Sequence, residues 1–346
     1  MAEELTIILV IVLVAMAVGL AFSIGANDET LASLVGAGVL KFKIALIIGG
    51  IAIGSGMVLF SGGFVPETIG KSLLGEGLSE QYTNIMLLTV LISSIIWLVV
   101  GSFAGIPLSS THSLIGSIVG VVIVFAFFNP SMVNLGNAFN YDKLRDVVLS
   151  WFISPISGLL VTYILFKISS KLFLSRLRGL NQIEKSEKSF KWMLLIAVLF
   201  AEIWVGANSG EALGILLGLR ENGSINNVQY LTFAIFCAIF AFLGIYFAAR
   251  YVIRNLASHM IDTRPSEGFI IQISSAIVLM IATLWALPIS HSHVIVFCII
   301  GLSIAQKKEI DYRGLGKMAI YWVITFPVAA LLAGFLYFIL SSFGLS

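Results

Sequence analysis

The sequence predicts an all-α, polytopic integral membrane protein, built as an inverted-topology duplication with discontinuous, re-entrant half-helices. Three observations lead to this fold class: the composition, a series of long apolar runs, and motifs that recur at a fixed spacing. Hydrophobic residues make up 59% of the chain and charged residues only 11%. A soluble domain carries about 25% charged residues, so lipid rather than water is expected to solvate this chain.

Apolar runs divide the chain into long and short candidate helices. A helix that spans a bilayer needs about 20 apolar residues. Eight runs approach or exceed this length, namely 5–24, 44–64, 84–106, 147–168, 192–207, 228–249, 269–288 and 317–342. Four shorter apolar runs follow polar breaks, at 28–40, 111–128, 209–219 and 292–305. Most of the short runs are expected to be half-helices that do not cross the membrane alone.

Three motifs of the first half recur in the same order in the second half. GANDETLASLVG at residue 25 is echoed by GANSGEALGILLG at residue 206, and PLSSTHSLIGSIVG at 107 by PISHSHVIVFCIIG at 288. Both pairs share an offset of 181 residues, and WFISPISGLLVTYILFKI at 151 has its own echo at 322. A shared offset predicts an internal duplication. We expect a first membrane repeat at 1–168, a basic cytoplasmic linker at 169–191, which looks like a hydrophilic loop, and a second, inverted repeat at 192–346.

Charge placement favours inversion over a parallel duplication. We assume that each half makes two crossings, forms a hairpin that enters and returns at the proline motif, and makes a final crossing. The number of net crossings per half is then odd, so the second half must be inverted. The loops at 41–43, 167–191, 250–267 and 306–317 then share one side and hold 16 of the 20 Lys and Arg residues. By the positive-inside rule that side is cytoplasmic. The sequence thus predicts a multi-pass protein of the cell membrane with both termini extracellular.

Polar residues at the starts of the short helices predict an anion site. These breaks begin at Asn27-Asp28, Ser109-Ser110-Thr111, Asn208-Ser209 and Ser290-His291-Ser292. Asn, Asp, Ser and Thr are favoured N-cap residues, and helix N-termini that converge at membrane depth bind anions without Lys or Arg. The candidate substrate-binding residues are therefore Ser109, Ser110, Thr111, Ser290, Ser292, Asn27 and Asn208. The alternative for any single Ser or Thr is a role in packing or helix capping.

Ionisable residues near the breaks are candidates for ion binding. An acidic residue inside a membrane is costly, so Asp28 and Glu211 suggest function by default, although Asp28 could instead end a solvated loop. Glu29 and Glu202 could be ligands or structural residues. His112 and His293 occupy equivalent positions in the two repeats. Each could hydrogen-bond a backbone carbonyl, contact an oxyanion or carry a proton.

At these motifs the chain resembles the inorganic phosphate transporter (PiT) family of sodium- or proton-coupled phosphate permeases and related sulfate permeases. The duplicated family signature GANDVANA is similar to GANDETLA (25–32) and GANSGEAL (206–213). The family's second element is similar to PLSSTH (107–112) and PISHSH (288–293), and GGFVPETI (62–69) and SWFISP (150–155) also resemble it. The resemblance covers nearly the whole chain. It implies a phosphate site between the repeats with cations bound beside it, and a homodimer.

The chain departs from the family pattern at three acidic positions. Ser209 replaces the second signature Asp, and Gly54 and Gln272 stand where the family often has Glu. The remaining candidates for cation binding are Asp28, Asn27, Asn208, Ser209 and Glu211, with Na⁺ expected at Asp28. The choice between Na⁺ and H⁺ stays open. Acidic groups near the breaks favour phosphate, which can donate a hydrogen bond to a carboxylate, but sulfate or another tetrahedral oxyanion remains the alternative.

The leading hypothesis is a secondary transporter that imports inorganic phosphate with Na⁺ or H⁺. An anion channel is the second hypothesis, because discontinuous helices also occur in channels. A membrane-embedded enzyme is disfavoured, since the Ser–His proximity in SSTH has no third member to orient a base. No cofactor and no nucleic-acid partner are expected. The expected partners are phosphate, the coupling cation and the lipid bilayer.

Overall fold

The computed structural model is almost entirely helical in the residues that it describes. These are 2–69, 73–75, 78, 83–176, 178–259, 264–310 and 312–343. In the first half the helices are α1 (Ala2–Ala26), α2 (Ala32–Gly36), α3 (Phe42–Leu59), α4 (Phe64–Glu67), α6 (Asn84–Ala104), α7 (Ser110–Phe128), α8 (Leu135–Ala138) and α9 (Tyr141–Leu172). A short 3₁₀ turn, Leu174–Arg176, follows α9.

The second half repeats this order of long and short helices. Its helices are α10 (Leu180–Asn208), α11 (Glu211–Glu221), α12 (Asn227–Phe247), α13 (Arg250–His259), α14 (Pro265–Leu284), α15 (His291–Gln306) and α16 (Tyr312–Ser342). Among the described residues, nine helical segments are long and apolar enough to cross a membrane. The prediction of a polytopic helical membrane protein is therefore confirmed.

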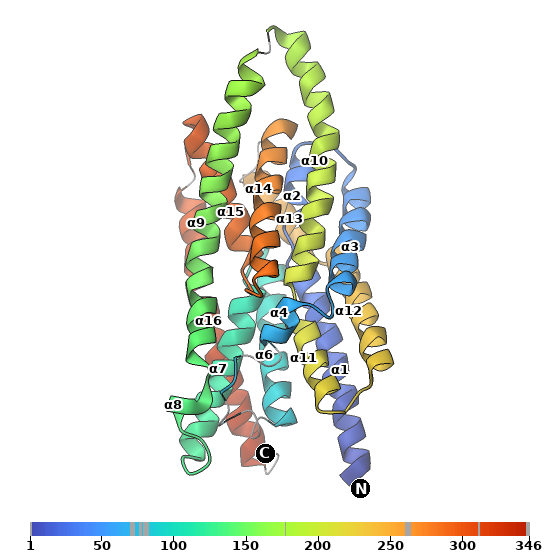
Figure 1. The fold of residues 1–346 in the computed structure, drawn as a ribbon, viewed down its shortest axis with the longest axis vertical. Helices are drawn as coiled ribbons and strands as arrows, with labels where there is room; N and C mark the ends of the chain where they lie inside the picture. Colours follow the sequence, from blue (N-terminus) through green and yellow to red (C-terminus); the bar gives the residue numbers. More distant parts are fainter. Residues whose placement is uncertain are drawn as a thin grey trace.

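The two halves run in opposite directions. In Figure 1, α1 rises from the lower end of the molecule, whereas α10 descends from the upper end, and both chain termini lie at the lower end. The hairpin of α6 and α7 occupies the lower half, and the hairpin of α14 and α15 the upper half. Each hairpin turns at its proline motif, as expected from the sequence. The duplication is thus inverted, and the hairpin tips meet in the middle of the molecule.

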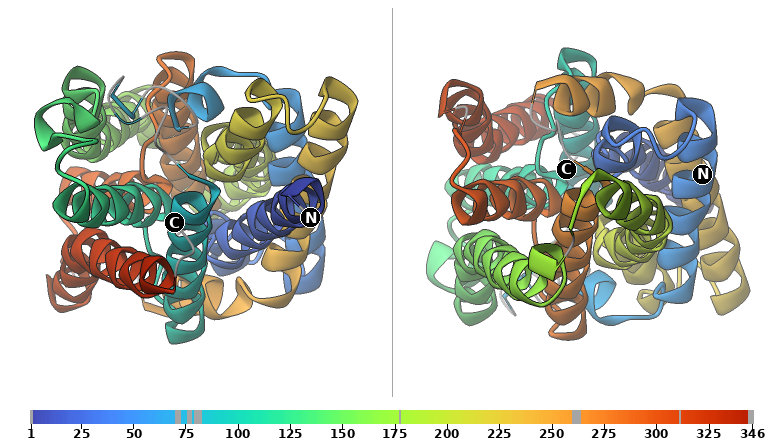
Figure 2. Two further views of the ribbon diagram at one scale, coloured as in Figure 1. Left: turned by 90° about the horizontal axis from the view of Figure 1, so that it is seen from below. Right: turned by 90° about the horizontal axis from the view of Figure 1, so that it is seen from above.

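Helices from different halves pack against each other, so the repeats interlock. The helix α3 lies against α10 and α12, α7 against α16, and α9 against α15. Figure 2, which looks along the long axis, shows these helices side by side across the section. Large apolar side chains such as Val323 and Leu331 stay exposed on the outer surface. This distribution suits a helix bundle whose outer surface contacts lipid.

The segment 169–191 differs from the expected hydrophilic loop, because most of it is helical. The helices α9 and α10 continue into it from both sides and project beyond the other helices at the upper end of Figure 1. The chain reverses near Gly179, whose φ of 84° suits glycine. An exposed ion pair one turn apart, Lys188 Nζ to Glu184 Oε1 at 2.8 Å, supports the polar part of α10. Low hydropathy therefore marked the end of the membrane span and not the end of the helix.

Candidate functional site

Each GAN motif breaks a long helix in the middle of the molecule, and its Asn fastens the break to a hairpin tip. The Asn27 amide donates to the Leu108 carbonyl, and the Leu108 N–H donates back to Asn27 Oδ1 over 3.1 Å. In the second repeat, Asn208 Nδ2 donates to the Leu287 carbonyl over 3.1 Å, and the Ile289 N–H donates to Asn208 Oδ1 over 3.1 Å. Both amides satisfy backbone groups at chain breaks that would otherwise be buried without partners.

The first serine of each proline motif caps the helix that follows it. Ser109 Oγ accepts from the His112 N–H over 3.2 Å, and Ser290 Oγ accepts from the His293 N–H over 3.5 Å. Both serines are the N-cap residues of their helices, α7 and α15. The positive ends of these two helix dipoles therefore lie in the centre of the protein, where charge is poorly screened.

Two acidic side chains at the helix breaks pair with the hairpin of the opposite repeat. Glu211, at the start of α11, accepts hydrogen bonds through Oε1 from Ser110 Oγ at 2.9 Å and Thr111 Oγ1 at 3.0 Å. Glu29 Oε1 lies 3.2 Å from Nδ1 of His291, at the start of α15. Ser110 and His291 are equivalent positions in the two repeats, but the two acids are not, because Gly210 is the equivalent of Glu29 and Thr30 is the equivalent of Glu211.

Asp28 lies beside these acids and is also buried. Its Oδ1 accepts from Thr30 Oγ1 at 2.8 Å, and its Oδ2 has no hydrogen-bond partner among the described residues. The carboxyl group of Glu202, from α10, is within interaction range of those of Asp28 and Glu29. Several acidic groups therefore gather at the first helix break, where the GANDET sequence interrupts the membrane helix.

A small polar cavity of about 40 Å³ lies where the breaks and the hairpin tips meet. The repeats contribute to it about equally. Its lining comprises Ile24, Asn27, Asp28, Glu29, Leu108, Ser109, Ser110, Val205, Ser209, Ser290, His291 and Ser292. Among the described residues no lysine or arginine lines it. Helix N-termini, hydroxyls and a histidine face it together with two carboxylic acids, so the cavity offers partners for both an anion and a cation.

The structure brings most of the predicted site residues to this cavity. Thr111 and Glu211 do not line it but are joined to Ser110 by the hydrogen bonds described above. Asn208 does not line the cavity, and its amide group is hydrogen-bonded to Thr283, Leu287 and Ile289. From the sequence the roles of Glu29 and Glu202 stay open between ligand and structural residue, and His291 has no assigned role in the site. The signal that could have selected them is their mismatch with the equivalent residues of the other repeat: Gly210, Ala21 and Ser110.

His112 and His293 lie behind the cavity rather than in its lining. Their ring centroids are 4.8 Å apart, and each also packs against a tryptophan, His112 on Trp151 at 4.0 Å and His293 on Trp322 at 4.2 Å. These contacts place the pair between α9 and α16 in an apolar pocket. The arrangement favours a structural role in ring packing, which differs from the carbonyl hydrogen bond, the oxyanion contact and the proton transfer considered from the sequence.

Two positions that lack the family's acid have a local structural role. The Gln272 amide, fully buried on α14, donates to the Thr30 carbonyl at 2.9 Å and to Ser33 Oγ at 2.7 Å. Gly54 allows α3 to approach α12 closely, since a Cβ atom there would lie 3.1 Å from the Ala238 carbonyl oxygen. A hydrogen bond and a close helix contact therefore occupy these positions in this chain.

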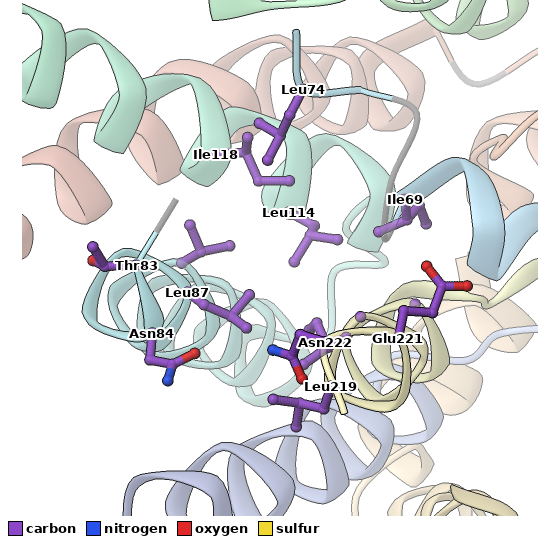
Figure 3. Close-up of a pocket in the computed structure, with 14 residues that line it drawn as sticks. Ile69, Leu74, Thr83, Asn84, Leu87, Leu114, Ile118, Leu219, Glu221 and Asn222 are labelled. Carbon is purple, nitrogen blue, oxygen red and sulfur yellow. The ribbon is translucent and has the colours of Figure 1, made fainter. Parts of the chain in front are cut away.

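A larger cavity of about 340 Å³ lies below the polar cavity, on the side of the chain termini. It extends between α6, α7 and α11. Figure 3 shows Leu114 and Ile118 of α7 facing it, with Asn222 and Glu221 at the end of α11 and Asn84 at the start of α6. Leu114 is one helical turn from Ser110, and Gly214, which also lines the cavity, is nearly one turn from Glu211. This cavity therefore extends from the polar centre toward the lower end of the molecule.

Polar contacts fasten the opposite, upper side of the second hairpin. Glu187 of α10 accepts from the Ser266 N–H at 3.0 Å and from Ser266 Oγ at 2.7 Å. Glu267 Oε1 lies 3.0 Å from Lys308 Nζ, just beyond α15. The two ends of the α14–α15 hairpin are thus tied to each other and to α10.

Inverted repeats, broken helices and a polar cavity at their meeting point are the architecture typical of secondary transporters. The sequence profile of the phosphate transporter family matches residues 24–333, and the chain belongs to this family. It is a transporter and not an enzyme.

Known proteins resemble the chain over almost its whole length. A Bacillus subtilis protein named probable low-affinity inorganic phosphate transporter is 27% identical, over 98% of this chain and 99% of its own. A protein of the same name from Rhizobium meliloti is 28% identical over 81% of this chain and 80% of its own. A solved structure described as the sodium-dependent phosphate transporter superposes with a TM-score of 0.83. It is 22% identical and covers 96% of this chain and 99% of its own. That structure supports the fold.

Proposed function

We propose that this protein imports inorganic phosphate by secondary active transport, coupled to Na⁺ or H⁺, and binds the anion in the polar cavity. The observation that supports this most directly is the meeting of two capped helix N-termini with buried acidic groups in one cavity. Helix N-termini attract an oxyanion, and a nearby carboxylate attracts a cation. Adjacent binding of opposite charges is a physical basis for coupling, because each ion stabilises the other.

Hydroxyl groups and backbone N–H groups would hold the anion in this proposal. Ser109 and Ser110 belong to the first hairpin, and Ser290 and Ser292 to the second, and all four line the cavity. Oxygen atoms of phosphate accept hydrogen bonds from such donors. Asn27 and Asn208 would support the site indirectly, since their amides hold the hairpin tips in place.

The carboxylic acids favour phosphate over sulfate. Hydrogen phosphate has an O–H group that can donate to a carboxylate, whereas sulfate at neutral pH only accepts. Asp28 and Glu29 line the cavity and provide such acceptors. A sulfate permease remains the second candidate, favoured by the many hydroxyl donors at the hairpin tips.

Asp28 is the proposed centre of cation binding. Its Oδ2 atom is buried without a hydrogen-bond partner in the described part of the chain. A hard cation such as Na⁺ prefers oxygen ligands, and Ser209, which faces the same cavity, supplies another. A proton on Asp28 would neutralise the same group, so uptake must be tested under gradients of both ions.

Removing one donor from the cavity tests the anion site. We expect Ser110→Ala to weaken phosphate uptake about 10- to 100-fold. The Ser110 hydroxyl, which donates to Glu211 in this structure, would turn to the anion on binding, and hydrogen bonds to charged groups contribute about 1.5–3 kcal/mol. The measurement is uptake of labelled phosphate by reconstituted vesicles under Na⁺ or pH gradients. Ser154→Ala is the matched control, since Ser154 is buried on α9 and does not line the cavity.

Three outcomes would contradict the proposed function. Sulfate uptake that phosphate does not compete with would assign the site to sulfate. Conduction without counterflow exchange would indicate a channel, because exchange requires alternating access. Equal uptake by Ser110→Ala and by the unmodified protein would exclude the hairpin hydroxyl from anion binding.

The cavity in Figure 3 is the proposed entry path from outside the cell. It lies on the side of the chain termini, which the distribution of Lys and Arg predicts to be extracellular. Ile118 lines it, and its repeat equivalent Ile299 lies on α15 in the upper hairpin. Both side chains are 7% exposed, so intrinsic burial does not distinguish them.

Thiol labelling tests both the path and the orientation. In a background lacking Cys237 and Cys298, we expect a membrane-impermeant thiol reagent added outside intact cells to modify Ile118→Cys and reduce phosphate uptake. Ile299→Cys is the matched control and is expected to resist modification from that side. Labelling of Ile299→Cys but not Ile118→Cys would reverse the proposed orientation or the open side.

A further inference from the structure

The apolar pocket between α9 and α16 faces the lipid side of the helix bundle. It has a volume of about 500 Å³ and is called the aromatic pocket here, after Trp151, Phe152, Trp322 and Phe326 in its lining. Two residues of its lining, Phe152 and Val323, are 65% and 73% exposed on the outer surface. In Figure 2 both α9 and α16 lie at the edge of the molecule. A ligand can therefore reach the aromatic pocket from the hydrocarbon of the bilayer.

Three ring nitrogens in the lining of this pocket lack hydrogen-bond partners among the described residues. They are Nε2 of His112, Nε2 of His293 and Nε1 of Trp151, and all three atoms are buried. His112 and His293 are only 7% and 6% exposed. A buried polar group without a partner is destabilising, and the interior of a bilayer supplies no water to satisfy it. Three such groups in one pocket indicate a ligand that forms hydrogen bonds with them.

The equivalent tryptophan of the second repeat does have a hydrogen-bond partner. In the motif that begins at Trp151 and recurs at Trp322, these two residues occupy the same position. The indole N–H of Trp322 donates to the Pro107 carbonyl over 3.2 Å, at the tip of the first hairpin. The indole N–H of Trp151 makes no such bond, although its ring packs on His112. The inverted fold therefore does not require this N–H to be unpaired.

The depth of the aromatic pocket restricts what can occupy it. His112 and His293 lie in the first turns of α7 and α15, which begin at the hairpin tips in the middle of the molecule. Phospholipid headgroups stay at the bilayer surface, roughly 15 Å from the midplane. Acyl chains reach the midplane but carry no group that hydrogen-bonds a ring nitrogen. The occupant is thus a lipophilic molecule with a neutral polar group.

The chemistry of the lining favours a hydroxyl group on an aromatic ring. A neutral imidazole has one nitrogen that donates and one that accepts, whereas the indole nitrogen only donates. A hydroxyl can accept from Trp151 and also donate to an imidazole, which a carbonyl or an ether cannot do. The rings of Trp151 and Phe326 meet edge to face with centroids 6.1 Å apart, and aromatic ligands pack well against such walls. The volume is in the range of small-molecule sites.

We propose that the aromatic pocket binds a neutral phenol dissolved in the membrane, with its hydroxyl hydrogen-bonded to Trp151 and to the histidine pair. Trp322 and Phe326 would contact the ring of the phenol. Its alkyl substituents would extend past Val323 into the lipid. This site is separate from the polar cavity, and ligand binding to it does not depend on the proposed transport of phosphate.

Photolabelling of the full-length protein in lipid nanodiscs tests the site. The probe is 4-octylphenol with a diazirine in its alkyl chain, and mass spectrometry locates the labelled residues. A matched probe carries a methyl group in place of the hydroxyl. We expect labelling of α9 and α16 around the pocket that an excess of 4-octylphenol abolishes. The methyl probe should bind about 3- to 10-fold more weakly, because it lacks the hydrogen bonds of the hydroxyl.

Two variants remove ring nitrogens and keep the aromatic packing. Trp151→Phe and His293→Phe should each weaken binding of the phenol about 3- to 10-fold and leave the methyl probe unaffected. Trp204→Phe is the matched control, because its indole nitrogen is also buried without a partner in the described chain, but its ring packs against Phe60 and Phe200 outside the pocket.

Three results would overturn the proposal. Labelling that 4-octylphenol does not displace would mean that the pocket holds no such ligand, as when a second copy of the chain covers it. Equal affinity for the two probes would assign the pocket to lipid chains. Unchanged binding of the phenol by folded Trp151→Phe and His293→Phe variants would show that the ring nitrogens do not contact the hydroxyl.

Discussion

Replacing Asp28 by asparagine is expected to abolish cation-coupled phosphate uptake while the protein still folds. The substitution removes the charge of a buried carboxylate whose Oδ2 has no hydrogen-bond partner in the described residues. An asparagine can keep the hydrogen bond from Thr30, because its Oδ1 also accepts. Breaking a buried ionic contact costs about 3–5 kcal/mol, which corresponds to a loss of at least about 100-fold in cation affinity.

Uptake of labelled phosphate in proteoliposomes measures this effect under Na⁺ and pH gradients in turn. Asp146→Asn is the control, because Asp146 is exposed and pairs with Arg145 outside the cavity. Thermal unfolding should be similar for the two variants. If Asp28→Asn takes up phosphate with the ion dependence of the unmodified protein, Asp28 has no role in coupling.

Replacing Gly206 by alanine is expected to destabilise the fold strongly. A Cβ atom at Gly206 would lie 2.0 Å from the Ile53 carbonyl oxygen, and one at Gly56 would lie 2.0 Å from the Ile203 carbonyl oxygen. The two glycines thus allow α10 and α3 to pack backbone against backbone, as small residues do in membrane proteins. Since the clash is with backbone, the helices must separate, at a cost of about 1–3 kcal/mol or more.

Thermal unfolding of the purified protein in detergent measures this cost. Gly316→Ala is the matched control, because Gly316 lies within the long helix α16 with nothing within 4 Å of its added Cβ. Alanine also has the higher helix propensity, so the control should be neutral or slightly stabilising. Equal unfolding temperatures for Gly206→Ala and Gly316→Ala would show that the contact does not limit stability.

The same close contact recurs across the inverted repeat. A Cβ atom at Gly25 would lie 2.1 Å from the Ala241 carbonyl oxygen, and one at Gly244 would lie 2.1 Å from that of Phe22. Gly25 and Gly206 are the first residues of the two GAN motifs. The glycine of each motif therefore permits close helix packing at the break, and the asparagine two residues later fastens the break to a hairpin. Motif conformation and helix packing are linked at this point.

Much of the architecture could be predicted from the sequence because hydropathy and repetition report it directly. The shared offset between the GAN and proline motifs identified the duplication and the polar residues at the breaks, and the placement of Lys and Arg identified the inversion. The helical structure of segment 169–191 was not predicted, since hydropathy measures compatibility with lipid and not helicity. Its exposed helical turns depend on helix propensity and local ion pairs such as Glu184–Lys188.

The sequence by itself determined the membrane class, the duplication and the set of polar residues that meet in the centre. Only the tertiary structure decided what those residues contact. It placed the amides of Asn27 and Asn208 on backbone groups, packed His112 and His293 against tryptophans, and brought Glu202 to Asp28. The physical reason is that motif spacing determines where a helix breaks, whereas side-chain partners depend on packing between segments far apart in the chain.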